Sequence, residues 1–177
     1  MMDDHERQLA LQKLRETSET FLTEVREVIE VQAIWKPAPD RWSILECIEH
    51  VAIAERGMFH LMTRKLTPFA RANDSPGRED GFFTRGTDRS KKLIAPETAR
   101  PSGRFANLAE AVNTFEANRS HTIAYIESCQ EELRRLEVVH PLFGPVTARE
   151  CLALLTVHPA RHAQQVRELR NHPQFPR

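Results

Sequence analysis

Four stretches of the chain repeat apolar residues at the three- and four-residue spacing of an α-helix, whereas the alternation expected of a β-strand is nearly absent. These stripes predict helices over about residues 3–33, 43–66, 107–136 and 147–170. Each helix is apolar along one face and has to bury that face against its neighbours. The sequence therefore predicts an all-α fold, a four-helix bundle, in which any functional site is built between helices.

Local signals indicate where some of these helices begin and end. Ser43 with Glu46, and Thr147 with Glu150, have the spacing of a capping box, in which each side chain bonds the backbone N–H of the other residue. The first predicted helix ends before Lys36-Pro37, because a residue that precedes proline is disfavoured in helical conformation.

The lengths of the connections restrict how the helices are arranged. Residues 34–42 and 137–146 are short loops that make sequential helices antiparallel, whereas residues 67–103 are long enough to cross the bundle. The second and third helices are therefore expected to run parallel, in up-down-down-up order. The long connection is rich in proline and glycine, a composition that resists regular structure. We interpret it as a lid that Phe82 and Phe83 could pin to the bundle.

Composition narrows the class of protein and its partners. A chain of 177 residues fits one domain, residues 1–177, and can bury a core without disulfides. Its 25 basic and 25 acidic residues leave no net charge, which argues against nucleic acid or an anionic membrane as a partner. The N-terminus lacks a signal peptide and no apolar run reaches about 18 residues, so a cytoplasmic protein is expected. A small-molecule substrate or a low-molecular-weight thiol remains as partner, and the sequence leaves a homodimer open.

The cysteines do not indicate a disulfide framework or a cysteine-rich metal site. Cys47, Cys129 and Cys151 are an odd number, lie far apart and contain no CxxC pair. We expect them to be small buried residues of a protein in a reducing compartment.

Two histidines stand one helical turn apart in the fourth predicted helix. His158 and His162 fall in its apolar stripe, at the i and i+4 spacing that lets two imidazoles chelate one ion. Both therefore point into the bundle, where their ring nitrogens need partners. A shared metal ion would satisfy two of these nitrogens. The alternative is a pair of core histidines that bond only to protein groups.

A third histidine lies at a matching depth on the second predicted helix. His50 is about 10 Å from the start of that helix, at about 1.5 Å per residue. If the fourth helix runs antiparallel to the second, His162 and His158 lie roughly 12 to 18 Å from the same end of the bundle. The three imidazoles can then meet at one divalent metal ion and leave a fourth position for water or substrate, as reactive zinc sites do.

The motifs around these histidines resemble those of the DinB/YfiT-like superfamily of four-helix bundles. The resemblance covers most of the chain except residues 67–92, and it is carried by Trp42-Ser43, Glu46, His50, the segment from Ala95-Pro96 to Pro101, and His158-x3-His162-x2-Gln165-Val166. It implies a metal site of His50, His158 and His162, usually assigned to zinc or nickel. It leaves several reactions open, because the superfamily includes low-molecular-weight-thiol S-transferases, a thiol-dependent isomerase and proteins described as metal-dependent hydrolases.

Several other residues have both a functional and a structural interpretation. Gln165 shares a face of the fourth predicted helix with His158 and His162, and it could orient one of them or bond a neighbouring helix. Glu46 could act as a base near the metal, although its capping position already explains it. Glu55 and Arg119 lie within the apolar stripes of the second and third predicted helices, and we expect them to form a structural ion pair. Pro159 departs from the family pattern and is expected to kink the helix between the two ligands.

The predicted topology decides which loops lie near the metal. Arg100 and Arg104, at the end of the long connection, are placed at the mouth of the site, where they either bind an anionic substrate or remain solvated. The turn that begins at His140 is placed away from the metal. The open face of the metal is therefore expected to point toward residues 96–107.

Three functions remain open from the sequence. The first is a metal-dependent enzyme that activates a thiol or water, of the thiol S-transferase or hydrolase type. The second is a non-catalytic metal-binding or interaction module, in which the metal holds two helices together. The third is a metal-free bundle whose histidines only pack.

Overall fold

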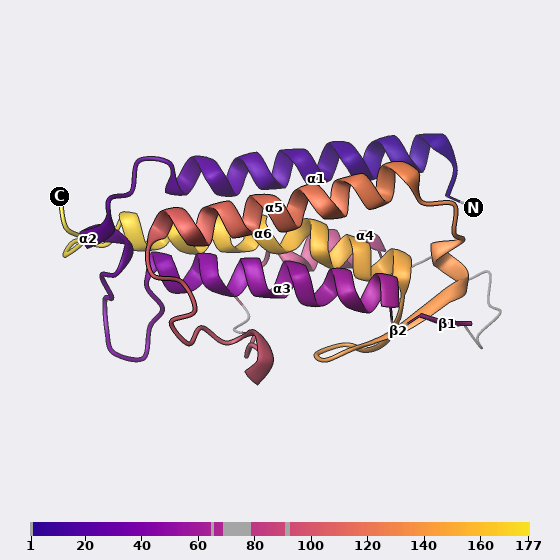
Figure 1. Ribbon diagram of the computed structural model, residues 1–177. Helices are drawn as coiled ribbons and strands as arrows, with labels where there is room; N and C mark the ends of the chain where they lie inside the picture. Colours follow the sequence, from indigo (N-terminus) through magenta and orange to yellow (C-terminus); the bar gives the residue numbers. More distant parts are fainter. Residues whose placement is uncertain (1, 65, 69–78, 91–92) are drawn as a thin grey trace.

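The predicted helices form the long elements of the fold. The computed structural model describes residues 2–64, 66–68, 79–90 and 93–177 (Figure 1). Its long helices, which lie side by side as a bundle, are α1 Asp4–Val25, α3 Ile44–Arg64, α5 Leu108–Ser128 and α6 Ala148–Arg170. The predicted all-α, four-helix class is therefore confirmed.

The four helices run in two directions. Figure 1 shows that α1 and α6 run in one direction and that α3 and α5 run in the other. Arg167 near the end of α6 accordingly pairs with Glu24 near the end of α1. Asn118 of α5 donates to the carbonyl oxygen of Ala52 in α3 at 2.9 Å. The connection between α3 and α5 includes residues outside the described ranges, so its full course across the bundle stays a prediction.

Two helices end earlier than their apolar stripes predict. α1 ends at Val25 and α5 at Ser128, instead of near residues 33 and 136. The buried guanidinium of Arg7 donates to two backbone carbonyl oxygens at the end of α5, at 2.6 and 2.9 Å, and so satisfies this terminus from another helix. The apolar residues beyond the two ends belong in part to the short helices α2 Glu30–Ala33 and η2 Leu133–Arg135.

A small antiparallel sheet replaces the short loop predicted before α6. β2 Leu136–His140 pairs with β3 Gly144–Thr147, and β1 Thr67–Pro68 pairs with the other edge of β2. Val138 is 1% exposed while its neighbour Val139 is 66% exposed, which is the alternation of a half-buried strand. The prediction of a simple loop over residues 137–146 was wrong, because strands this short give too few alternations to stand out in the sequence.

The described part of the long connection also contains regular structure, contrary to expectation. It includes the helix α4 Glu79–Gly86 and the single turn η1 Glu97–Ala99. The Phe82 ring is buried and lies 5.4 Å from the Phe143 ring, a contact that helps to hold α4 in place. At the end of α4, a Cβ on Gly86 would overlap Cγ2 of Val157. Glycine therefore allows α4 to approach α6 this closely.

A buried polar layer lies between two apolar clusters of the core. One cluster includes Leu14 and the other includes Phe21, two turns further along α1. The polar layer between them consists of Glu55, Arg119 and Thr122, all at most 2% exposed.

Within the described residues, no helix has the length and apolar content needed to cross a membrane.

The three cysteines are buried and form no disulfide, as predicted. Cys47, Cys129 and Cys151 are at most 5% exposed. Burial raises the pKa of Cys151 to about 12 and raises the pKa of Cys47 further still. The thiols of Cys47 and Cys151 therefore stay protonated at neutral pH.

Candidate metal centre

The three predicted histidines meet between α3 and α6. His50 belongs to α3, and His158 and His162 to consecutive turns of α6. Their ring centroids are 4.6 to 4.9 Å apart, and one ring nitrogen from each lies within 4.8 Å of the others. Nε2 of His50 lies 3.0 Å from Nε2 of His158. This arrangement suits nitrogens that bind one ion at about 2.0 to 2.1 Å each.

Protein acceptors hold the outer nitrogens of two of these rings. Nδ1 of His50 donates to the carbonyl oxygen of Ala99 in η1, at 2.7 Å, and Nδ1 of His162 lies 3.0 Å from Oε1 of Gln165. A carbonyl oxygen only accepts, so His50 carries its hydrogen on Nδ1 and keeps a lone pair on Nε2. Such outer bonds orient the histidines of metal sites. The donor set therefore fits a divalent ion, and the contact of Gln165 with His162 agrees with the first of the two interpretations given for Gln165.

Burial keeps the three imidazoles neutral near pH 7. His50 and His162 are each 6% exposed. Burial lowers the pKa of His50. It lowers the pKa of both His158 and His162 well below the usual 6.5, and the neighbouring imidazoles and arginines lower these two further. Neutral imidazoles retain the lone pairs that a metal ion needs.

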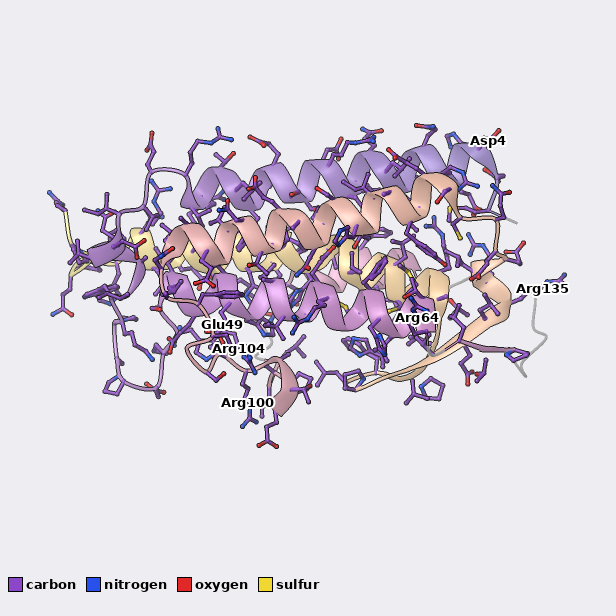
Figure 2. All side chains as sticks on the ribbon, in the orientation of Figure 1. Asp4, Glu49, Arg64, Arg100, Arg104 and Arg135 are labelled. Atoms are coloured by element: carbon purple, nitrogen blue, oxygen red, sulfur yellow. The ribbon has the colours of Figure 1, made fainter. Side chains whose placement is uncertain are left out.

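A buried carboxylate that the sequence did not predict lies beside His50 in the chain. Glu49 is 2% exposed and accepts hydrogen bonds from the backbone N–H groups of residues 102–103, at 2.8 and 3.1 Å. The same carboxylate forms an ion pair with Arg104 at 2.8 Å (Figure 2). These bonds attach the end of the long connection to α3 and help to place the Ala99 carbonyl against His50. No sequence pattern signals this contact, because the partners follow Glu49 by 53 to 55 residues.

The two arginines expected at the mouth differ in their contacts. Nη1 of Arg104 donates to Glu49 and to the carbonyl oxygen of Arg100, both at 2.8 Å. Arg104 therefore holds the loop together, which neither of the two expectations included. Nε of Arg100 donates to the carbonyl oxygen of Ala95 at 3.1 Å, and its side chain lies farther from the bundle than the Glu49–Arg104 pair (Figure 2).

Two other acidic residues have the structural roles expected of them. Glu46 accepts from the N–H of Ser43 at 2.8 Å, donates its own N–H to the Ser43 hydroxyl, and pairs with Lys36 at 3.0 Å. This is the predicted capping box. Glu55 and Arg119 form the predicted buried ion pair, at 2.8 Å. Burial raises the pKa of Glu55, and the bonds from Arg119 oppose that increase.

Pro159 lies between the two α6 histidines without ending the helix. Proline has no N–H to donate to the carbonyl oxygen of Leu155, four residues earlier. Nη2 of Arg119 donates to that oxygen at 3.2 Å, while α6 continues through Pro159 to Arg170. A buried arginine of α5 thus supplies the donor that proline removes, next to His158.

Of two further aromatic side chains, Trp42 lies against the site histidines and His140 lies elsewhere. The Trp42 ring lies 4.9 Å from the ring of His50 and 6.4 Å from that of His162, nearly parallel to the latter. Only the family resemblance had singled out Trp42. His140 lies in the hairpin, where its Nδ1 accepts the N–H of Leu142 at 3.1 Å, and it does not join the three site histidines.

A cavity in another part of the bundle does not include the histidines. Its volume is about 380 Å³, and it is lined by Leu66, Glu131, Glu132, Arg135 and Leu136. These residues lie beyond the end of α3 and around η2, whereas His50 lies near the start of α3. This cavity is therefore separate from the candidate metal centre.

Residues 10–166 match the sequence profile of the DinB superfamily. The chain belongs to the DinB superfamily. The matched range includes His50, His158 and His162.

Relatives of this DinB-superfamily protein share its sequence or its fold. It is 26% identical over 137 residues to the uncharacterized protein YuaE of Bacillus subtilis (strain 168), an alignment that covers 76% of this chain and 81% of YuaE. Its fold is similar to that of YfiT from Bacillus subtilis, described as a probable metal-dependent hydrolase with an unusual four-helix bundle topology, with a TM-score of 0.60 and 14% identity over 96% of this chain and 89% of YfiT. A conserved protein from Enterococcus faecalis gives a TM-score of 0.62 and 18% identity over 92% and 94% of the two chains. These structural likenesses establish the fold alone.

Proposed function

We propose that this DinB-superfamily protein binds one divalent metal ion through His50, His158 and His162 and catalyses hydrolysis with it. The proposal is carried by three neutral imidazoles from two helices, those of His50 and His162 buried and that of His158 half-buried, whose ring nitrogens lie close together. The description of YfiT as a probable metal-dependent hydrolase supports the same class of reaction. Zinc or nickel suits an all-imidazole ligand set, and the cytoplasm is the compartment we propose.

A bound ion would supply a Lewis acid that makes water, or a low-molecular-weight thiol, nucleophilic near pH 7. The chain itself supplies positioning. Ala99 and Gln165 hold two imidazoles by their outer nitrogens, and Trp42 covers two of the rings. Three protein ligands leave room for substrate, whereas structural zinc sites are closed by four.

A second candidate is a non-catalytic bundle in which the ion only joins α3 to α6. This candidate is favoured because three carboxylates around the site are all hydrogen-bonded or ion-paired to other protein groups. Glu46 caps α3, Glu49 holds residues 102–103, and Glu168 pairs with Arg89. None of these three described side chains is left as a ready general base.

Metal analysis of ligand variants tests the site. The full-length protein is loaded with Zn²⁺ or Ni²⁺, separated from free ion and analysed for bound metal. His50→Ala, His158→Ala and His162→Ala should each lose the ion that the wild type retains, because the imidazoles bind usefully only together. His60→Ala changes an exposed histidine of the same helix as His50 and should keep its metal. Full retention in His50→Ala would refute the three-histidine site.

Activity assays separate the candidate functions. The metal-loaded wild type and His50→Ala are compared on a panel of esters and amides, and hydrolysis that only the wild type performs supports the proposal. Turnover that requires an added low-molecular-weight thiol and an electrophile would replace hydrolysis with thiol transfer. A fully loaded protein that is inactive in both kinds of assay would favour the non-catalytic candidate.

A further inference from the structure

Arg89, from the part of the chain outside the family motifs, contacts a row of side chains next to His162. His162, Gln165 and Glu168 follow one another at three-residue spacing on α6. Arg89 donates Nε and Nη2 to the two carboxylate oxygens of Glu168, both at 2.7 Å, and Nη1 to Oε1 of Gln165 at 3.2 Å. The same Oε1 lies 3.0 Å from Nδ1 of His162. Two hydrogen bonds therefore link Arg89 to His162.

The chemistry of these groups fixes the direction of each hydrogen bond. A guanidinium only donates, so the amide of Gln165 has to turn its oxygen, and not its NH₂ group, toward Arg89. That oxygen also faces Nδ1 of His162, which must then carry the hydrogen of the neutral ring. The lone pair of the ring is left on Nε2, where a metal ion can use it.

We propose that Arg89 is a positioning residue for the metal centre, which acts by locking the amide of Gln165 and, through it, the tautomer of His162. The inference rests on the proposed metal site. Pairing of two guanidinium nitrogens with Glu168 holds the plane of Arg89 in place and directs its third nitrogen at Gln165. The long connection thus contributes to the site from the α6 side.

The backbone before Arg89 is itself held against α6. Nη1 of Arg161 donates to the carbonyl oxygens of Gly86 and Asp88. Gly86 packs directly on Val157, where a Cβ would overlap the valine side chain. Arg89 therefore reaches Gln165 from a backbone that α6 fixes at several points, and not from the tip of a free loop.

The direction in which Arg89→Met changes the affinity for Zn²⁺ distinguishes the positioning of His162 from electrostatic repulsion between Arg89 and the ion. Removing a cation near a divalent ion would by itself tighten metal binding, because like charges repel. Loss of positioning should instead weaken Zn²⁺ binding by about three- to tenfold, less than the 10–100-fold typical of a residue that bonds a ligand directly. Titration with Zn²⁺ against a competing chelator measures the Kd of the full-length protein. Arg89→Lys keeps the charge and one donor and should recover part of the loss.

Arg167→Met is the matched control for Arg89→Met. It removes the same charge and another Arg–Glu ion pair of α6, the one with Glu24. Because Arg167 has no bond to Gln165 in the network described above, this variant should bind Zn²⁺ with wild-type affinity. Metal-free Arg89→Met and Arg167→Met should have similar thermal midpoints. A much lower midpoint for Arg89→Met would mean that its weaker binding reflects general destabilisation, and would overturn the positioning role.

A double-variant cycle tests whether Arg89 acts through Gln165. In the Gln165→Met background, Arg89→Met should change the Kd for Zn²⁺ by less than about twofold, because the amide that connects Arg89 to His162 is already absent. An equal loss in both backgrounds, or tighter binding in Arg89→Met alone, would overturn the proposal.

Nitrogen-15 NMR of the metal-free protein makes failure of this inference distinguishable from failure of the proposed function. His162 of the wild type should carry its hydrogen on Nδ1, and Arg89→Met should shift the ring toward a mixture with the other tautomer. A hydrogen on Nε2 of His162 in the wild type would overturn the role of Arg89, whatever the metal result. The expected tautomer in a protein that binds no Zn²⁺ would support the link from Arg89 and refute the metal site.

Discussion

At the scale of single residues, the side chains that sequence reasoning found are those related by helical geometry. His158 and His162 are related by a four-residue spacing, and His50 by its depth, because a fixed rise per residue converts position into distance. Glu49 and Arg89 lacked any such relation. Their partners lie 53 and 76 residues away in sequence, and only the folded chain brings them together.

His140 should make stability depend on pH in a way that can be isolated. Burial lowers its pKa to about 4, and its Nδ1 accepts the N–H of Leu142, which a protonated ring cannot do. The unfolded chain has the ordinary pKa of about 6.5, so acid favours unfolding. The stabilisation from neutral His140 is therefore fully present above about pH 7 and is lost as pH falls from about 6.5 to 4.

Urea unfolding of the wild type and of His140→Asn, from about pH 8 to 4, measures this effect. The Asn oxygen can accept the same N–H but does not titrate. The difference in free energy of unfolding should be constant above about pH 7 and should shift in favour of His140→Asn by roughly 1 to 3 kcal/mol at pH 4. A difference that does not change with pH would show that protonation of His140 does not lower the free energy of unfolding.

At the scale of elements, the sequence predicted the long helices and missed what ends or joins them. Apolar stripes gave α1, α3, α5 and α6, but α5 ends where a buried arginine of α1 takes its last carbonyl oxygens. The hairpin was not predicted because its strands, five and four residues long, give too few alternations to stand out in the sequence. α4 forms in a proline- and glycine-rich connection because it packs on α6, a tertiary contact that composition does not encode.

The dependence of α6 on α5 at Pro159 can be measured. Arg119→Met should lower the free energy of unfolding of the metal-free protein by about 3 to 5 kcal/mol, because Glu55 is left buried without its partner. In a Pro159→Ala background this loss should be about 1 kcal/mol smaller, because the restored backbone N–H bonds the carbonyl oxygen of Leu155 in place of Arg119. Urea unfolding of the four proteins gives the difference. The same loss in both backgrounds would mean that Arg119 does not support α6 through this carbonyl.

At the scale of the whole molecule, the connection lengths predicted which long helices run parallel, and helix depth then placed the histidines together. The proposed metal would link α3 to α6 across the bundle. A ligand that binds only the folded state stabilises it by about 2.7 kcal/mol at 100 times its Kd. For a chain of this size that is a rise of roughly 5 to 10 °C in thermal midpoint.

Thermal unfolding with and without excess Zn²⁺ checks this linkage. The wild type and His60→Ala should show the rise, and His50→Ala should show none. An equal rise in His50→Ala would indicate that the ion stabilises the protein at some other place.

The burial of all three cysteines has a practical consequence for thiol chemistry. The thiolate is the reactive form, and Cys47, Cys129 and Cys151 are covered by the bundle. A colorimetric thiol reagent added to the folded protein should therefore report an added cosubstrate without background from the protein. Ile94 is 70% exposed in the connection between α4 and η1, so Ile94→Cys would give a single attachment point for a fluorophore near the start of the segment that contacts His50.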